Sequence, residues 1–344
     1  MSELPKTGRG PLTRRRMVIT LTASGAILAL AALIAVGIGS GPPGPIESLW
    51  IVFGGEAEHA STVVVEVRSL RVAMGVLAGA ALAAVGVVLQ LLLRNPLADP
   101  YVVGVSGGAA LAGSIAILVM GQGPWVPPAA FAGAAGATFF TLNAARVGNR
   151  PPDVSILLVG VVFNAFAAAV ITFLKTLVEA QKAQEVLFWL VGFVGYARGT
   201  TVIVVALCVA VALGVLIWLS PRLHLLSLGD SAAARLGVDV ERTRFLALLA
   251  ASLATGAVVA ETGLIGFVGL IVPHALRLQV GPDPRLLLPV SALIGGAALC
   301  LVDAFTRSLF MVFSSEPPVG ALCAAIGAPI FVLLLRRHLK GRRA

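Results

Sequence analysis

The sequence predicts an all-α, polytopic membrane protein. Of its 344 residues, 58% are hydrophobic and only 12% are Asp, Glu, Lys or Arg, whereas soluble domains carry about 25% charged residues. Apolar runs of about 18 to 25 residues recur, and each is long enough to cross a hydrocarbon core of roughly 30 Å. We therefore expect one compact membrane domain rather than two soluble domains.

Ten apolar runs, separated by prolines, glycines and charged residues, are candidate helices. Residues 1–16 are polar and basic, and the run that follows is too long for a signal peptide, so we expect a retained first helix. The domain plan is a cytoplasmic N-terminus at 1–16, a single ten-helix domain at 17–336 and a cytoplasmic C-terminus at 337–344. The predicted helices lie at residues 17–39, 70–93, 103–120, 127–146, 154–179, 200–219, 244–261, 264–279, 286–305 and 318–335.

Glycine and proline patterns add detail to this plan. In the second helix Gly75 and Gly79 form a GxxxG pattern, and the run Ala132–Ala137 in the fourth contains only alanine and glycine. Small residues at this spacing predict close packing of helix backbones. A short or broken helix is expected for the eighth, because it is crowded by Gly263, Gly266, Gly269 and Pro273.

The positions of lysine and arginine predict the orientation, because cytoplasmic segments carry an excess of both. With the N-terminus inside, 19 of the 25 fall on the inner side. This bias predicts an even number of spans with both termini in the cytoplasm, and it places Arg94 to Asp99 at the cytoplasmic face. The remaining six lie at or near the outer side: Arg68, Arg71, Lys175, Lys182, Arg198 and Arg307.

Several kinds of function are excluded by residue patterns. No lysine follows a glycine, so a Walker A motif is impossible, and we do not expect the chain itself to be an ATPase or other enzyme. The 4 histidines and 3 cysteines lack metal-binding spacing, so no metal or cofactor is expected. The net charge of +9 comes from basic residues scattered at the ends of apolar runs, a pattern that does not favour nucleic acid as a partner.

Charged residues within or beside the predicted spans are few. They lie near the predicted outer helix ends, where side chains reach the interface, which does not favour a proton or ion relay. Two alternatives stay open: a stand-alone ion-coupled secondary transporter, which needs a charge near the midplane, and a structural membrane subunit of a larger complex. The residues in question are Lys175, Glu179, Glu261 and Asp303.

The longest predicted cytoplasmic connection spans about residues 220–244. Within it, the stretch SLGDSAAARLGV has an Asp near its start and a Gly after its Leu, which predicts a short capped helix. Such a helix is either a simple amphipathic connector or a lever through which a cytoplasmic motor subunit acts on the membrane domain.

Several stretches together resemble the permease subunits of vitamin B12, haem and iron-siderophore ABC importers, the FecCD-type family. The stretches, in the family's order, are RNPLADPYVVGVSGGA from Arg94, LSLGDSAAARLGVDVERTR from Leu226, GLIGFVGLIVPHALR from Gly263, GPDPRLLLPVSALIGGAAL from Gly281 and EPPVGALCAAIGAPIFVLLLRR from Glu316. The resemblance implies the inverted-repeat type II ABC importer fold, with ten helices per subunit, in a bacterial or archaeal inner membrane. It also implies a second copy of the chain, two separate ATPase subunits that bind the ATP, and a periplasmic or lipid-anchored substrate-binding protein.

The resemblance also implies roles for particular residues. The short helix that inserts into the ATPase is matched by Leu228, Gly229, Asp230, Ala233, Leu236, Gly237 and Val238. The cytoplasmic gate is matched by Asn95, Leu97, Asp153 and Val154. The arginines that receive acidic residues of the binding protein are matched by Arg68, Arg71 and Arg307.

The substrate implied by the resemblance is an iron chelate, as a siderophore complex or haem, or cobalamin. Bulky chelates require a wide, largely apolar cavity with few fixed charges. Such a cavity could be lined by aromatic residues, although aromatics at this spacing also serve in packing: Phe163, Phe166, Phe188, Trp189 and Phe193.

Overall fold

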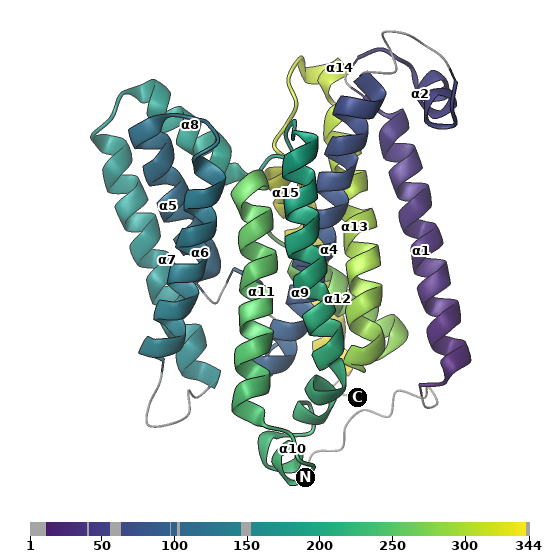
Figure 1. Cartoon of the computed structure of the whole chain (residues 1–344), viewed down its shortest axis with the longest axis vertical. Coiled ribbons are helices and arrows are strands. Elements are labelled where there is room, and N and C mark those ends of the chain that lie inside the picture. The colour runs from purple at the N-terminus through teal and green to yellow at the C-terminus, as the bar shows by residue number, and fades with distance from the viewer. Residues whose placement is uncertain are drawn as a thin grey trace.

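The regular elements of the computed structural model are helices throughout the residues that it describes, which are 12–39, 41–55, 63–96, 98–101, 104–145 and 153–341. The longer helices run side by side along the vertical of Figure 1. Their bounds are α1 Arg14–Gly37, α4 Ser69–Leu92, α5 Val105–Met120, α6 Val126–Ala144, α7 Asp153–Thr176, α9 Gly199–Leu226, α11 Val240–Thr262, α12 Val268–Val280, α13 Pro284–Ser308 and α15 Val319–Gly341. The short elements are α2 Pro45–Val52, the π-helix η1 Val63–Arg68, α8 Ala180–Val191, α10 Asp230–Arg235 and α14 Phe310–Phe313.

Each predicted range holds one of the longer helices, so the all-α fold class is confirmed. The number of membrane spans stays a prediction, because length and composition alone qualify 6 helices of the described chain, and three further apolar helices are shorter. The 6 segments are Arg14–Gly37, Val63–Leu92, Leu158–Thr176, Gly199–Leu226, Val240–Thr262 and Pro284–Ser308.

Two helices show how local sequence sets the boundaries. The eighth predicted helix is short as expected: α12 has 13 residues, which at about 1.5 Å per residue gives roughly 20 Å. The prediction that the sixth helix ends at residue 219 is wrong, because α9 continues through Pro221 to Leu226. A proline removes one backbone donor, and the burial of Leu223 and Leu226 beyond it favours continuation.

Helix α4 lies at the centre of the packing, against α13, α12, α11 and α9. Its contacts depend on glycine: a Cβ at Gly79 would overlap the carbonyl of Gly295 in α13, and a Cβ at Gly86 would overlap that of Gly269 in α12. The close packing expected from the GxxxG pattern is therefore confirmed at Gly79. In the same way Gly133, from the Ala132–Ala137 run, packs against α5.

The helices form two groups that meet at α11. Helices α5, α6, α7 and α8 lie on one side, and α1, α4, α9, α12, α13 and α15 lie on the other (Figure 1). Helix α11 packs against α9 and α4 of the second group and against α6 and α5 of the first. The two groups are therefore joined through a largely buried helix.

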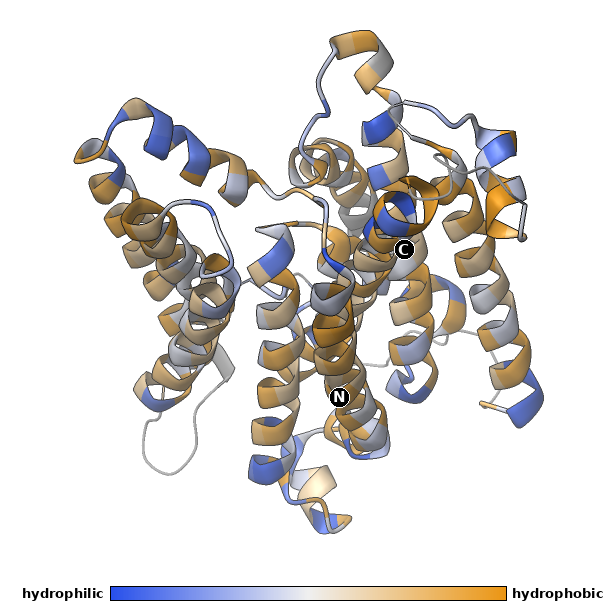
Figure 2. Ribbon diagram, turned by 45° about the horizontal axis from the view of Figure 1, so that its top comes forward, coloured by the Kyte–Doolittle hydropathy of each residue, from blue (hydrophilic) through white to orange (hydrophobic). Residues whose placement is uncertain are grey.

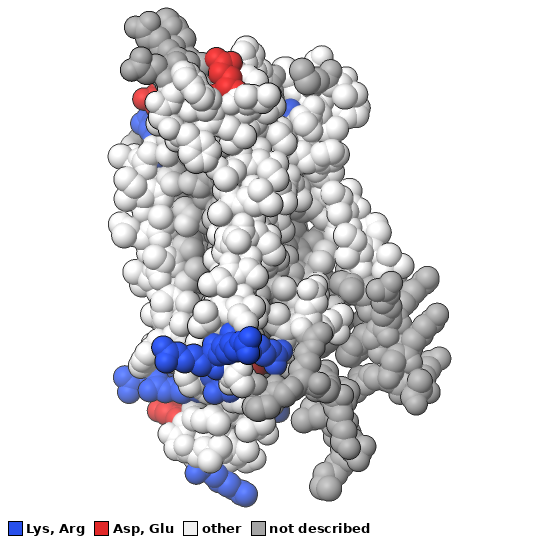
Figure 3. Space-filling model, turned by 90° about the vertical axis from the view of Figure 1, so that its right-hand side faces the viewer, with Lys and Arg blue, Asp and Glu red and all other residues white. Residues whose placement is uncertain are grey.

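The two ends of the molecule differ in composition. The first turn of α1 lies at the same end as α10, whereas α2, α8 and α14 lie at the opposite end (Figure 1). Figure 2 shows hydrophobic residues along the middle of the helices and hydrophilic residues at their ends. Lys and Arg side chains gather in a band at the α10 end (Figure 3). At that end the Arg16 Nη2 donates to the backbone oxygen of Val280 at 2.7 Å.

Candidate coupling, gating and docking sites

The short helix α10 projects from the cationic end of the molecule (Figure 1). It begins after Gly229 and is followed by Gly237, whose φ angles of 113° and 82° lie in the region that favours glycine. The predicted short helix, with a glycine after its C-terminus, is therefore confirmed, whereas no side chain caps its N-terminus.

Four of the seven residues predicted to couple the chain to an ATPase fall into two sets by exposure. Leu228 and Leu236 are 58% and 61% exposed and flank the helix on its outer surface. Ala233 and Val238 are 0% and 9% exposed and pack toward the helices behind. The two leucines are therefore the side chains that a partner would contact first, whereas Ala233 and Val238 anchor the helix.

The side chain of Asp230, the first residue of α10, pairs with two arginines of the same chain. Its carboxylate accepts from the Arg94 Nη2 at 2.7 Å and from the Arg244 Nη2 at 3.1 Å. The Arg94 and Asp230 side chains are 52% and 39% exposed, and solvent-exposed pairs of this kind contribute about 0.2–1 kcal/mol. Asp230 thus joins α10 to the end of α4 and the start of α11.

A pocket of about 940 Å³ opens beside α10 at this end. Its lining comes from several elements that are distant in sequence, including Arg94 after α4, Leu142 in α6, Ile156 in α7 and Phe245 in α11. The α4–α5 connection therefore starts beside this pocket, and both helices that flank the α6–α7 connection contribute to its lining. These are the two connections predicted to form a gate.

The gate residues themselves are only partly described by the structure. Asn95 donates its backbone N–H to the Gln90 oxygen at 3.2 Å, and its own carbonyl accepts from the Ala98 N–H at 3.0 Å. Leu97 lies outside the described residues, and so do the side chains of Asp153 and Val154 at the start of α7. The gate stays a prediction.

The second half of the α4–α5 connection is held by polar contacts. The Asp99 Oδ1 accepts from the Tyr101 N–H at 2.9 Å, and burial raises the pKa of Asp99 to about 6 although this hydrogen bond lowers it. The Tyr101 hydroxyl donates to the Ile265 oxygen at 2.9 Å and accepts from the Ile265 N–H at 2.8 Å. The connection is thereby fixed to the turn between α11 and α12.

Asn164, within α7, completes this attachment. Its Nδ2 donates to the Tyr101 carbonyl at 2.7 Å, and its Oδ1 accepts from the Gly107 N–H at 3.0 Å. Sequence reasoning missed both Tyr101 and Asn164. The available signals were a tyrosine directly after Pro100 and an amide inside an apolar helix, where an unpaired polar group is costly.

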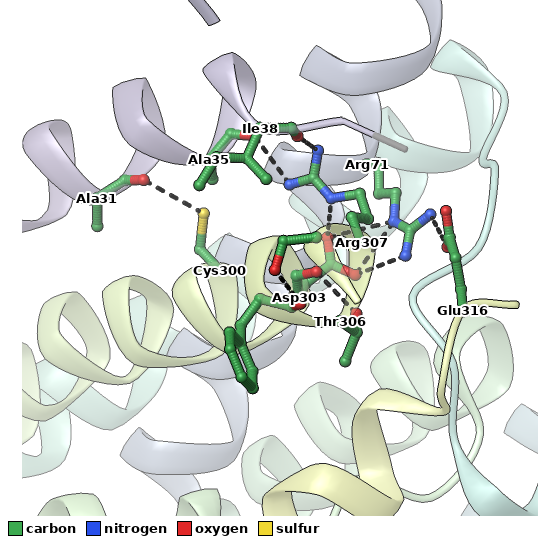
Figure 4. A network of polar contacts seen from close by, with 11 residues as sticks. Ala31, Ala35, Ile38, Arg71, Cys300, Asp303, Thr306, Arg307 and Glu316 are labelled. Carbon is green, nitrogen blue, oxygen red and sulfur yellow. Dashed lines mark hydrogen bonds and ion pairs between the residues drawn. The ribbon is translucent and has the colours of Figure 1, made fainter. Parts of the chain in front are cut away.

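The predicted docking arginines lie at the opposite end, and all are buried: Arg68 is 5%, Arg71 is 9% and Arg307 is 2% exposed. Figure 4 shows Arg71 and Arg307 on either side of Asp303. Arg71 pairs with Asp303 at 2.9 Å and with Glu316 at 2.7 Å.

Backbone and hydroxyl oxygens accept from other nitrogens of these arginines. The Arg307 Nη2 donates to the Ala35 carbonyl at 2.8 Å, and its Nε lies 3.2 Å from Asp303. The Arg68 Nη1 donates to the Ser48 hydroxyl at 2.7 Å.

These contacts bear on two expectations. The three guanidinium groups are buried, and oxygen atoms of the same chain accept from each of them. Asp303 does not reach the interface, because it is only 1% exposed between two arginines. Docking of a binding protein by these arginines stays a prediction.

The aromatic residues proposed to line a cavity separate into different environments. The centre of the Phe163 ring lies 5.5 Å from that of Phe140 and 6.5 Å from that of Phe166. These rings lie where α6 and α7 face each other. The Trp189 ring occupies the space above Gly113. Phe193 lies under the Arg71 guanidinium at 5.0 Å. A single aromatic wall is therefore not formed within one subunit.

A bundle of apolar helices, with polar connections and a short projecting helix at its cationic end, fits a membrane transport permease. The chain belongs to the FecCD transport family, whose model matches residues 27–337.

Similar proteins agree with this assignment. The cobalamin import system permease BtuC of Halobacterium salinarum is 43% identical over 287 residues, which cover 82% of this chain and 75% of that protein. The hemin transport permease HmuU of Yersinia pestis is 36% identical over 80% of this chain and 84% of its own length. A solved ABC transporter assigned to the metal-chelate type, in an inward-facing conformation, has a TM-score of 0.83 at 29% identity, over 92% of this chain and 98% of that chain. This match confirms the type II ABC importer fold.

Proposed function

We propose that this chain is the membrane-spanning permease subunit of an ATP-binding cassette importer that carries an iron chelate or cobalamin inward by alternating access. Membership of the FecCD family supports the class, and relatives named for cobalamin and hemin support the substrate. The observation that carries the proposal is α10 itself, a short helix that exposes Leu228 and Leu236 at the cationic end.

The proposed partners are a second copy of the chain, two ATPase subunits and a periplasmic or lipid-anchored binding protein. Membership of the family supports a second copy, and we place it against α7, which leaves large apolar side chains exposed, including Leu158, Val162 and Phe166. ATP binds the separate subunits, since the chain has no Walker A lysine. A cross-link between copies, formed in membranes through a cysteine introduced at Val162, would test the dimer.

The proposed location is the cytoplasmic membrane of a bacterium or archaeon, with α10 and both termini inside. The band of Lys and Arg at the α10 end supports this orientation, because such residues are enriched in cytoplasmic segments (Figure 3). A reporter enzyme that is active only in the cytoplasm, fused to the C-terminus, should be active. An inactive reporter on a membrane-inserted chain would reverse the orientation.

The proposed gate contains Asn95, Leu97, Asp153 and Val154. The pairing of the two loops is supported by one pocket whose lining includes Arg94, Leu142 and Ile156, which flank them. The proposed docking arginines are Arg68, Arg71 and Arg307. For docking, a carboxylate of the binding protein would have to replace an internal partner such as Glu316, which is 17% exposed.

A docking experiment tests the coupling role of α10. Replacing Leu228 and Leu236 together by Ala should reduce retention of the ATPase on the purified permease by at least about tenfold, since a few apolar anchors dominate most interfaces. The matched control is Leu177→Ala, which truncates a leucine of similar exposure, 66%, at the end of α7. Equal retention by both variants would make α10 a simple connector.

Transport itself is tested in proteoliposomes that contain the assembled complex. Cobalamin, haemin and a ferric siderophore are compared with and without ATP, and we expect ATP-dependent uptake of one of them. Uptake driven by a proton gradient without ATP would instead establish the stand-alone secondary transporter.

A further inference from the structure

Asp230 connects two parts of the molecule that the proposed function requires to move together. It is the first residue of α10, and its carboxylate binds Arg94, which lies 136 positions away in the sequence. Arg94 directly precedes Asn95, the first residue of the proposed gate. The contact therefore spans from the coupling helix to the gate connection.

The backbone on both sides of this contact is anchored in a defined way. Arg94 follows α4 with a φ of 47°, a left-handed conformation for a non-glycine residue. Its N–H donates to the Leu91 oxygen at 3.2 Å, which ties it to the last turn of the buried helix α4. On the other side Gly229 turns the chain into α10. A shift of α10 therefore acts on Arg94 through one ion pair.

The exposure of the pair suits a contact that forms and breaks. Arg94 and Asp230 are half-exposed, so the pair contributes little to the stability of the fold. Asp230 also has a second cation, Arg244, whose Nη2 lies 3.1 Å away and which is 17% exposed. When the pair with Arg94 opens, the carboxylate keeps a partner on α11.

We propose that Asp230 is a positioning residue that transmits movement of α10 to the α4–α5 connection through Arg94. This inference rests on the proposed function, in which an ATPase moves α10. It assigns to the Asp230 carboxylate a role within the permease, distinct from the leucines that face the ATPase.

The test in the assembled transporter compares Arg94→Gln with Arg94→Lys, which keeps the charge. Uptake per ATP hydrolysed should fall about fivefold or more in Arg94→Gln, a factor typical of coupling between sites, and should largely recover in Arg94→Lys. Arg285→Gln is the matched control, because it removes an arginine of 43% exposure, paired with Asp283 at 2.6 Å, from the same end. ATPase retention and the apparent melting temperature should not change in any of the three variants.

Two results would overturn the inference while leaving the proposed function intact. One is unchanged uptake per ATP in Arg94→Gln. The other is loss of ATPase retention in that variant, which would place Arg94 in docking.

A second measurement needs no partner protein. In the full-length permease in detergent, Asp230→Asn should speed hydrogen exchange of the amides at residues 95–101, whereas Arg285→Gln should leave it unchanged. If the wild-type complex shows no ATP-driven uptake, the proposed function fails. The hydrogen-exchange measurement then decides by itself whether Asp230 acts on the α4–α5 connection. Equal exchange in wild type and Asp230→Asn would refute this role of Asp230.

Discussion

Asp99, in the α4–α5 connection, has a carboxyl group whose ionisation should destabilise the folded protein. Burial raises its pKa to about 6, from a usual value of 3.8. The Asp99→Asn substitution removes the charge and keeps an oxygen that can accept from the Tyr101 N–H. At neutral pH the variant should therefore be more stable than the wild type.

The pKa shift gives the sign and the size of the effect. The folded state binds the proton more tightly than the unfolded chain does. The free energy of unfolding of the wild type therefore falls as the pH rises from about 4 to about 6, and above that range the contribution of Asp99 stays nearly constant. A difference of about 2 pH units between the two pKa values corresponds to at most about 3 kcal/mol. We expect about 1–2 kcal/mol, since Asp99 is partly exposed to solvent.

The assay is thermal unfolding of the purified chain in detergent. The apparent melting temperature of Asp99→Asn should exceed that of wild type by roughly 2–4 °C at about pH 7.5 and match it at about pH 4. Other titrating groups affect both proteins equally, so their contributions cancel in the difference between the two melting temperatures. A variant less stable than wild type at pH 7.5, or an equal gain at both pH values, would refute the reasoning.

Two further predictions concern the packing of α4. Gly86→Ala should lower the apparent melting temperature by several degrees, because the new Cβ overlaps the Gly269 carbonyl and forces α4 away from α12. The control is Gly136→Ala, where a Cβ meets nothing within 4 Å, and it should leave the melting temperature unchanged. Arg71→Gln should destabilise by about 1–3 kcal/mol, because Glu316 loses its paired arginine and Asp303 keeps only Arg307, and adding Glu316→Gln should recover part of the loss. Additive effects in the double variant would show that the pair is not coupled.

Much of the fold follows from hydropathy, because a long apolar run satisfies its backbone hydrogen bonds within a bilayer by forming a helix. Ten predicted ranges each hold a longer helix, and the short eighth helix was indicated by its glycines. Helix α8 was missed because it combines polar residues such as Lys182 and Glu185 with an apolar face, so no continuous apolar run marks it.

The candidate sites were predicted less completely, for a geometrical reason. Hydropathy and charge indicate the depth of a residue in the membrane but not the direction of its side chain around the helix. Arg71 and Arg307 were therefore placed correctly at one end, yet they point inward to Asp303 rather than outward. The partnership of Asp230 with Arg94 depends on where α10, which packs on α9 and α11, lies relative to the end of α4, and no local pattern encodes that.

The two glycine contacts of α4 also limit how this protein can change during evolution. Gly79 and Gly86 are seven residues apart, which places them on the same helix face, roughly 10 Å apart along the axis. Each position is matched by a glycine on a different neighbouring helix. A larger residue at either site would require a compensating loss of volume on the facing helix at the same time. Single substitutions there should be rare among functional variants, and the loops at both ends should diversify far more freely.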